Sequence, residues 1–140
     1  MMARDWRFAR SARLLFLSLA LLVAVCADTT SAPVTEPVFV IDVGGQQFRV
    51  RVTDPASIAD FEERRREAEA GIVAGPLRAG DGGFNAPWSW HLDPATVHVA
   101  DVSIGLCGGT PAAVEADLEY WLNQVGDFCP AGARVIGQTP

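Results

Sequence analysis

The first 27 residues limit how much of this 140-residue chain is left to fold, and in which compartment it folds. Four arginines precede an apolar run over residues 14–25, and the run ends at the small residues Val25, Cys26 and Ala27. A positive flank, a short apolar stretch and a small-residue exit are typical of a secretory signal peptide. The run is shorter than the roughly 20 residues that span a bilayer. We therefore predict a cleavable signal peptide over residues 1–27, no membrane span, and a secreted or extracytoplasmic product.

Cleavage after Ala27 leaves residues 28–140, which is enough chain for one small domain. This part carries seven arginines against sixteen acidic residues and no lysine, a formal charge of −9. Nucleic-acid binding needs a basic surface, and so does electrostatic docking on anionic lipid. We therefore predict neither a nucleic-acid partner nor an anionic membrane surface as partner.

The cysteines agree with an exported product. Cys107 and Cys129 follow the leader and lie beside turn-forming residues, so in an oxidising compartment they are predicted to form a disulfide. The alternative is two buried thiols packed as small hydrophobic side chains. Cys26 allows a second alternative, a lipid anchor, but Val25 precedes it where lipoprotein signals carry a smaller residue. A lipid anchor at Cys26 is therefore disfavoured.

The folded part is predicted to begin after a linker. Residues 28–37 are rich in Thr, Ser and Pro and indicate a flexible linker, which leaves residues 38–137 for the domain. Two runs of high β-propensity, 38–43 and 46–52, flank Gly44 and Gly45. The second run alternates apolar and polar residues, and two glycines suit a primed turn. These residues predict a β-hairpin.

Two helices are predicted from their starting residues. Asp54 and Pro55 form a favourable helix start, and Gly71 is the predicted stop. Thr110 and Pro111 repeat this pattern and open a second predicted helix over residues 111–124. The first helix contains three consecutive arginines (64–66) flanked by glutamates, which favours a solvated face of i,i+3 and i,i+4 ion pairs over a binding site.

The remaining runs predict strands over residues 72–77, 88–92, 97–107 and 133–136. The third of these changes face near Ala100 and Asp101, where a bulge is expected. The last is predicted to be a short edge strand. The order of elements describes a single small α+β domain, a mainly antiparallel sheet with two helices packed on one face.

No residue pattern predicts an enzyme, a metal site or a cofactor. The two histidines, His91 and His98, lack a nucleophile in an activating sequence context and lack metal ligands at short spacing. Each histidine is interpreted as a strand residue with a backbone hydrogen bond.

The aromatic segment over residues 84–94 is the strongest candidate for a functional surface. Strand alternation places Trp88 and Trp90 on one face, which we interpret as core, and Ser89 with His91 on the other. Asn85 is predicted to hold the turn before the strand through backbone hydrogen bonds. Asn85, Ser89 and His91 are the candidate ligand-binding residues. The alternative is an exposed pair of indoles that recognises a sugar or a peptide.

The same segment carries a resemblance to a known family. The ordered pieces resemble the N-terminal domain of the slime-mould calmodulin-binding protein family, which also occurs as exported single domains in bacteria. They are Phe84-Asn85, residues 88–94, Cys107 ahead of a helix with Val114-Glu115, and Cys129-Pro130. The resemblance implies a fold and an exported context, but no settled activity. Calmodulin itself is a discounted partner, because its usual target is a basic amphipathic helix and the second helix here is acidic.

The function predicted from these observations is that of an exported small interaction domain, with an unknown protein, peptide or sugar as partner. The alternative is a secreted protease inhibitor, or another inhibitor directed at an enzyme. Such an inhibitor would present a rigid loop held by the disulfide, at Phe128, Cys129, Pro130 and Ala131.

Overall fold

The computed structural model describes residues 36–103 and 105–139. The predicted signal peptide (1–27), Cys26 and residues 28–35 of the predicted linker lie outside the described residues. Among the helices of the described part, none is long and apolar enough to cross a membrane.

The hairpin opens the fold as predicted. Strand β1 (Val38–Val43) pairs antiparallel with β2 (Gln46–Arg51), and Val43 lies opposite Gln46. Gly44 and Gly45 both have positive φ, 59° and 86°, as the two central residues of a primed turn require. The hairpin prediction is confirmed.

Strand β3 (Ala70–Ala79) is the central strand, and it is longer than predicted. The sheet order is β2-β1-β7-β3-β4, and β5 and β6 also pair with β3. Gly75, predicted to interrupt this strand with Pro76, lies inside it. A Cβ at Gly75 would be 3.1 Å from the Cα of Val97, so the glycine allows a close approach of two backbones.

The partners of β3 correct two sequence predictions. Residues 133–136, predicted as an edge strand, belong to β7 (Ala131–Thr139), which lies between β1 and β3. Residues 97–107, predicted as one strand, contain only β5 (His98–Ala100), and β5 ends where the bulge was expected. The short strands β4 (Trp90–Leu92) and β6 (Asp127–Phe128) complete the pairing with β3. Chain-local patterns do not report how many neighbours a strand acquires, which explains the error at β7.

Helix α1 (Pro55–Glu67) starts as predicted and ends earlier. The Asp54 side chain accepts a hydrogen bond from the Ser57 amide at 2.8 Å. The helix ends at Ala68, which adopts a left-handed conformation (φ 54°, ψ 24°), and its carbonyl accepts a hydrogen bond from Arg134. Gly71, the predicted stop, lies in β3 opposite Ala133.

The second helical region is broken, although the sequence predicted one helix. It consists of α2 (Pro111–Ala116), α3 (Leu118–Tyr120) and a π-helical turn η1 (Trp121–Val125). Asp117 causes the break: its backbone is non-helical (φ −141°, ψ 57°), and its carboxylate accepts a hydrogen bond from the Tyr120 amide. Aspartate side chains compete with helical hydrogen bonds in this way.

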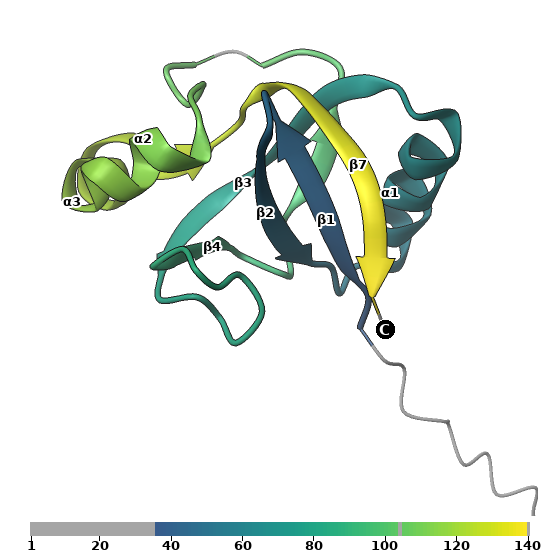
Figure 1. Cartoon of the computed structure of the whole chain (residues 1–140), viewed down its shortest axis with the longest axis horizontal. Helices are drawn as coiled ribbons and strands as arrows, with labels where there is room; N and C mark the ends of the chain where they lie inside the picture. Colours follow the sequence, from purple (N-terminus) through teal and green to yellow (C-terminus); the bar gives the residue numbers. More distant parts are fainter. Residues whose placement is uncertain (1–35, 104, 140) are drawn as a thin grey trace, which may run out of the picture. The chain divides into compact units, whose positions relative to one another are not determined.

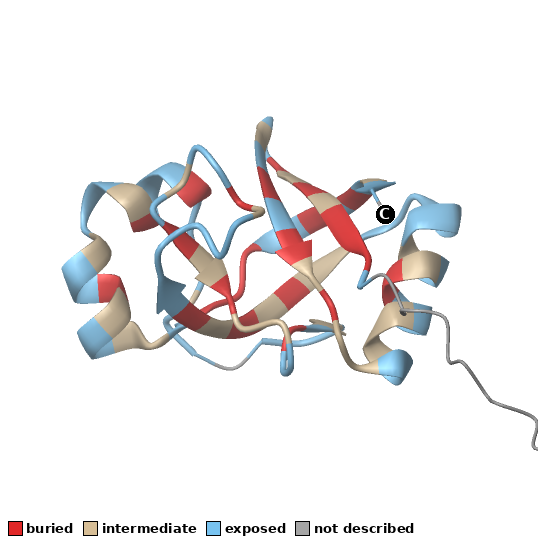
Figure 2. Cartoon of the chain, turned by 90° about the horizontal axis from the view of Figure 1, so that it is seen from below, coloured by how far each residue is buried: buried red, intermediate tan, exposed pale blue. Residues whose placement is uncertain are grey.

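The sheet curls around an aromatic core. Strands β2 and β4 contact each other although they stand at opposite ends of the strand order. Rings join them: Trp90 packs against Phe48 at 5.6 Å and against Phe128 at 5.3 Å between centroids, and Phe39 stacks on Phe61 of α1. Figure 2 shows the buried residues along the strands and on the sheet-facing sides of the helices.

The structure is an α+β domain with a mainly antiparallel sheet. Helix α1 contacts β5 and β7, α2 contacts β2, and η1 contacts β3 and β6. Figure 1 shows α1 at one end of the sheet and α2 with α3 at the other. The packing of both predicted helices on one face of the sheet stays a prediction.

Candidate functional site

Asn85 is a structural link between two strands. Its side chain is fully buried, and its Nδ2 donates a hydrogen bond to the Trp90 carbonyl at 2.7 Å. Its Oδ1 accepts a hydrogen bond from the backbone amide of Arg49 at 2.6 Å. The predicted backbone hydrogen bonds of Asn85 are therefore present. They engage both polar atoms of the amide inside the protein.

The two tryptophans of the aromatic segment differ in exposure. Trp90 is fully buried in β4, as predicted for a core residue. Trp88 precedes the strand and is half-buried, and its indole N–H donates a hydrogen bond to the Gln47 carbonyl at 2.8 Å. Trp88 packs against the edge of the core. The structure therefore does not present two adjacent exposed indoles.

Ser89 and His91 are the more accessible candidate ligand residues. Ser89 is exposed, and its backbone amide donates a hydrogen bond to the Glu115 carboxylate. His91 is half-buried, with Nδ1 2.7 Å from the Gly80 carbonyl and its ring edge-on to Phe84. The structure does not bring the Asn85 amide together with these two side chains at an open surface. The ligand-binding role of the three residues stays a prediction.

The described residues contain no group of three or more His, Cys, Asp or Glu side chains placed to hold a metal ion. His98 is exposed, and its Nδ1 lies 3.0 Å from the Thr96 carbonyl. Ser103 contacts the disulfide sulfurs, with Oγ 2.9 Å from the Sγ of Cys129. In a catalytic triad a carboxylate orients the histidine, whereas a backbone carbonyl does so here.

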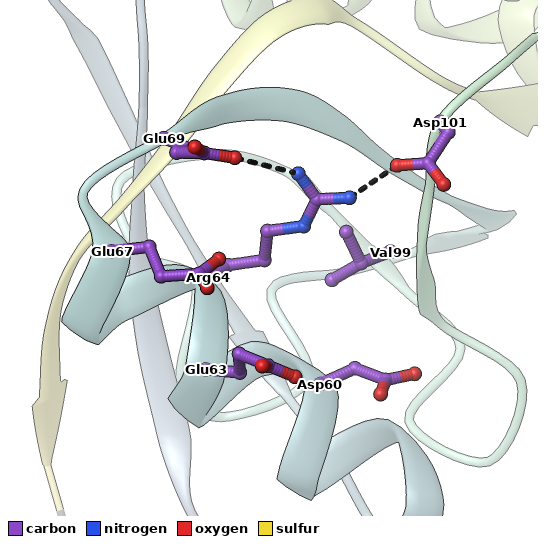
Figure 3. Close-up of a pocket in the computed structure, with 7 residues that line it drawn as sticks. All are labelled: Asp60, Glu63, Arg64, Glu67, Glu69, Val99 and Asp101. Atoms are coloured by element: carbon purple, nitrogen blue, oxygen red, sulfur yellow. Dashed lines mark hydrogen bonds and ion pairs between the residues drawn. The ribbon is translucent and has the colours of Figure 1, made fainter.

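An acidic pocket lies between α1 and β5. It has a volume of about 400 Å³. We define it by its lining residues, Asp60, Glu63, Arg64, Glu67, Glu69, Val99 and Asp101. Figure 3 shows Arg64 between Glu69 and Asp101, with Asp60 and Glu63 farther along the helix. Arg64 thus pairs with a turn residue and with the segment after β5, not with glutamates at i±3 or i±4.

An apolar groove lies on the other side of β5. Its volume is about 410 Å³, and the disulfide forms one of its walls. We define this disulfide groove by Ala74, Pro76, His98, Ala100, Val102 and the Cys107–Cys129 bridge. The predicted bridge is confirmed, with 5.1 Å between the two Cα atoms. The groove combines an apolar floor on β3 with a wall that is covalently held.

Exposed hydrophobic side chains gather around this groove. Val102, at its rim, is 74% exposed, and Leu106 is 90% exposed. Leu106 and the half-exposed Tyr120 line a neighbouring depression of about 290 Å³ that shares Cys107 with the groove. Apolar surface that clusters in this way marks an interaction site more often than single exposed residues do.

The sequence prediction missed this surface because Val102 and Leu106 were assigned to a strand. Their alternation with polar residues fits a half-buried strand, but β5 ends at Ala100. Gly105, Gly108 and Gly109 are the sequence signal that indicates a loop here. Read as a loop, the same residues indicate exposed hydrophobic side chains next to a disulfide.

The segment predicted as an inhibitory loop is not presented at the surface. Phe128, Cys129 and Pro130 are buried, and Phe128 packs against Trp90 and Trp121. Burial follows from its position, because Phe128 pairs with Gly75 of the central strand. An inhibitor that acts through these residues is therefore contradicted, while inhibition through another loop stays untested.

Comparison with known proteins agrees with the fold and the cysteine pair. No curated protein and no solved structure matches the chain. A family model for the N-terminal domain of the calmodulin-binding protein family matches residues 35–140. The match covers all the described strands and helices, both bridged cysteines and the aromatic segment. This chain belongs to the family of calmodulin-binding protein N-terminal domains that its aromatic segment and cysteines resemble.

Proposed function

We propose that this chain is an exported, non-enzymatic binding domain that holds a polypeptide partner in the disulfide groove. One observation carries the proposal. In the described part of the chain four large hydrophobic side chains are exposed, and three of them, Val102, Leu106 and Tyr120, surround Cys107. The burial of such side chains in a complex is favourable in proportion to the apolar area removed from water.

The groove is suited to binding rather than to catalysis. Ser103, His98 and Asp127 all line it, but His98 is oriented by a main-chain carbonyl and Ser103 contacts sulfur. Neither side chain is thereby activated as a nucleophile or a base. The apolar floor and the covalently held wall instead provide a preformed surface, which lowers the entropic cost of association.

A selection of random peptides tests the proposal. Peptides displayed on phage are selected on the chain with its disulfide intact and counted again on the variant Val102→Asp. We expect enriched sequences whose binding is lost on Val102→Asp. Binding should remain on Ile136→Asp, the matched control, because Ile136 is exposed to 49% and lines neither the groove nor the depression. The absence of any Val102-dependent sequence would overturn the proposal.

Export is tested separately. The chain is expressed with its leader in a bacterium, and the protein outside the cytoplasm is analysed by N-terminal sequencing and intact mass. Export predicts an N-terminus at Asp28 and a mass lower by two protons than that of the reduced form. A lipid adduct on Cys26 would replace the soluble product with an anchored one, and retention of residues 1–27 in the cytoplasm would contradict export.

The enzyme-directed inhibitor remains the second candidate, because Leu106 projects from a loop that the disulfide holds at Cys107. A panel of extracellular proteases incubated with the chain tests it. Tight, stoichiometric inhibition that Leu106→Asp abolishes would replace the general binding domain with an inhibitor.

A further inference from the structure

We infer that the partner in the disulfide groove is an extended, basic polypeptide segment that pairs as an additional strand with β5. This inference rests on the proposed function and adds to it the conformation and charge of the partner. Three features of the described residues carry it: an unpaired strand edge, the alternation of side chains along residues 98–102, and the charge on either side of that segment.

Strand β5 has one unpaired edge within the described residues. Ile72 of β3 pairs with Ala131 of β7 on one side and with Ala100 of β5 on the other. Among the described strands β5 pairs with β3 alone, so its second edge presents backbone amides and carbonyls without a strand partner. An extended peptide binds such an edge through main-chain hydrogen bonds, while its alternate side chains fill pockets.

The side chains of this segment alternate between the two pockets. His98, Ala100 and Val102 line the disulfide groove, whereas Val99 and Asp101 line the acidic pocket. A strand paired with β5 has the same alternation, because successive side chains point to opposite faces of a sheet. Every second side chain of the added strand therefore lies over the apolar groove, and the intervening ones lie over the acidic pocket.

The charges define the composition of the added strand. The acidic pocket contains five carboxylates and one guanidinium, and that guanidinium, on Arg64, is already paired with Glu69 and Asp101. Asp127 adds a further carboxylate at the disulfide groove. Arginine or lysine at the intervening positions complements this field, and apolar residues complement the groove. A second copy of the chain is disfavoured as the occupant, because residues 28–140 carry a charge of −9.

Defined peptides test the inference on the chain with its disulfide intact. The probe is a short, end-capped peptide that alternates arginine and valine, and binding is measured by calorimetry at low and high salt. The first comparison peptide has glutamate in place of arginine. The second has the same composition without the alternation. The third keeps every side chain but is N-methylated at alternate amides, in the two phases, so that the donors facing β5 are removed in one of them.

The alternating peptide should bind, more weakly at high salt because the ion pairs are screened. We expect Val102→Asp and one phase of N-methylation each to weaken binding by about tenfold or more, equivalent to the loss of one well-formed contact. Glu63→Gln with Glu67→Gln should weaken it and reduce its salt dependence, whereas Ile136→Asp should leave it unchanged. Val102 and Ile136 are exposed, so both Asp variants are expected to fold, as circular dichroism would verify.

The outcomes separate this inference from the proposed function. If phage selection yields Val102-dependent sequences that are acidic, or that tolerate N-methylation in both phases, the strand-addition inference is overturned and the binding domain stands. If neither the selection nor the alternating peptide shows Val102-dependent binding, both are overturned. Alternating basic and apolar sequences, sensitive to N-methylation in one phase, support both.

Discussion

Asn85 is the residue that most directly joins the two ends of the curled sheet. Strands β2 and β4 contact each other without pairing, and the Asn85 amide bonds the backbone of Arg49 on β2 and of Trp90 on β4. A buried amide of this kind replaces the missing ladder hydrogen bonds. Its role is therefore to close the sheet around Phe48 and Trp90.

Asn85→Ala is expected to destabilise the fold by about 2 kcal/mol or more, because it leaves buried backbone groups without partners. The free energy of unfolding is measured by urea titration. Ser89→Ala, at an exposed neighbour, is the control and should change stability by less than about 0.5 kcal/mol. Equal effects of the two variants would show that the Asn85 amide does not link the strands.

Two carboxyl groups make stability depend on acidic pH. Hydrogen bonds from Ser57, chiefly its backbone amide, lower the pKa of Asp54, and the backbone amide of Ala95 followed by Arg78 lowers the pKa of Asp93. A lowered folded-state pKa adds stability that is fully present above the unfolded value, about 3.9, and is lost as pH falls through the folded pKa.

Asp54→Asn should therefore flatten the dependence of unfolding free energy on pH below about pH 4, because it removes one titrating group and retains a capping side chain. Urea titrations between neutral and acidic pH measure this slope. Glu63→Gln, at an exposed carboxylate of the same helix, serves as the comparison, and its slope should stay close to that of the wild type. An unchanged slope in Asp54→Asn would contradict the linkage.

At the scale of elements, the end of α1 shows how tertiary contacts replace an intrinsic helix stop. Ala68 adopts the left-handed conformation that glycine favours, and Arg134 of β7 donates a hydrogen bond to its carbonyl. The contact between α1 and β7 thus ends the helix before Gly71. The strain of the left-handed alanine is offset by this packing.

Ala68→Gly is expected to stabilise the protein by about 0.5–1 kcal/mol, since glycine relieves the left-handed strain at a smaller entropic cost. Thermal and urea unfolding measure the change. Ala56→Gly, in the first turn of the same helix, is the control and should destabilise it. A loss of stability in Ala68→Gly would contradict the interpretation of this helix end.

At the scale of the whole molecule, the disulfide connects the irregular segment 101–109 to the central sheet. Cys107 precedes the second helical region, and Cys129 follows β6, which pairs with β3. The Cys107 carbonyl also accepts a hydrogen bond from the Cys129 amide at 2.8 Å. The bridge therefore encloses all of α2, α3 and η1 in one loop.

Replacement of both cysteines by serine should lower the free energy of unfolding by about 3 kcal/mol on the chain-entropy model for a loop of this length. Urea titration of the oxidised wild type and of the double variant measures the difference. Reduced wild type is the control and should match the variant. A difference below about 1 kcal/mol would show that the unfolded chain gains little freedom when the bridge is absent.

Local patterns in the sequence determined the hairpin, the start of α1, the disulfide pair and the burial of Trp90. Each of these depends on residues that are close in sequence, or on the chemistry of one residue type in an oxidising compartment. The same applies to the prediction that Asn85 bonds backbone, since turn residues commonly do so.

Only the tertiary structure decided which strands are central, where helices end and which surface is exposed. Residues 133–136 have the pattern of a short strand, but their place between β1 and β3 depends on pairing with residues far away in the sequence. Val102 and Leu106 have the pattern of a buried strand, but β3 offers a pairing partner only as far as Ala100. Hydrophobic periodicity records which side chains are apolar, whereas long-range pairing decides which of them are covered.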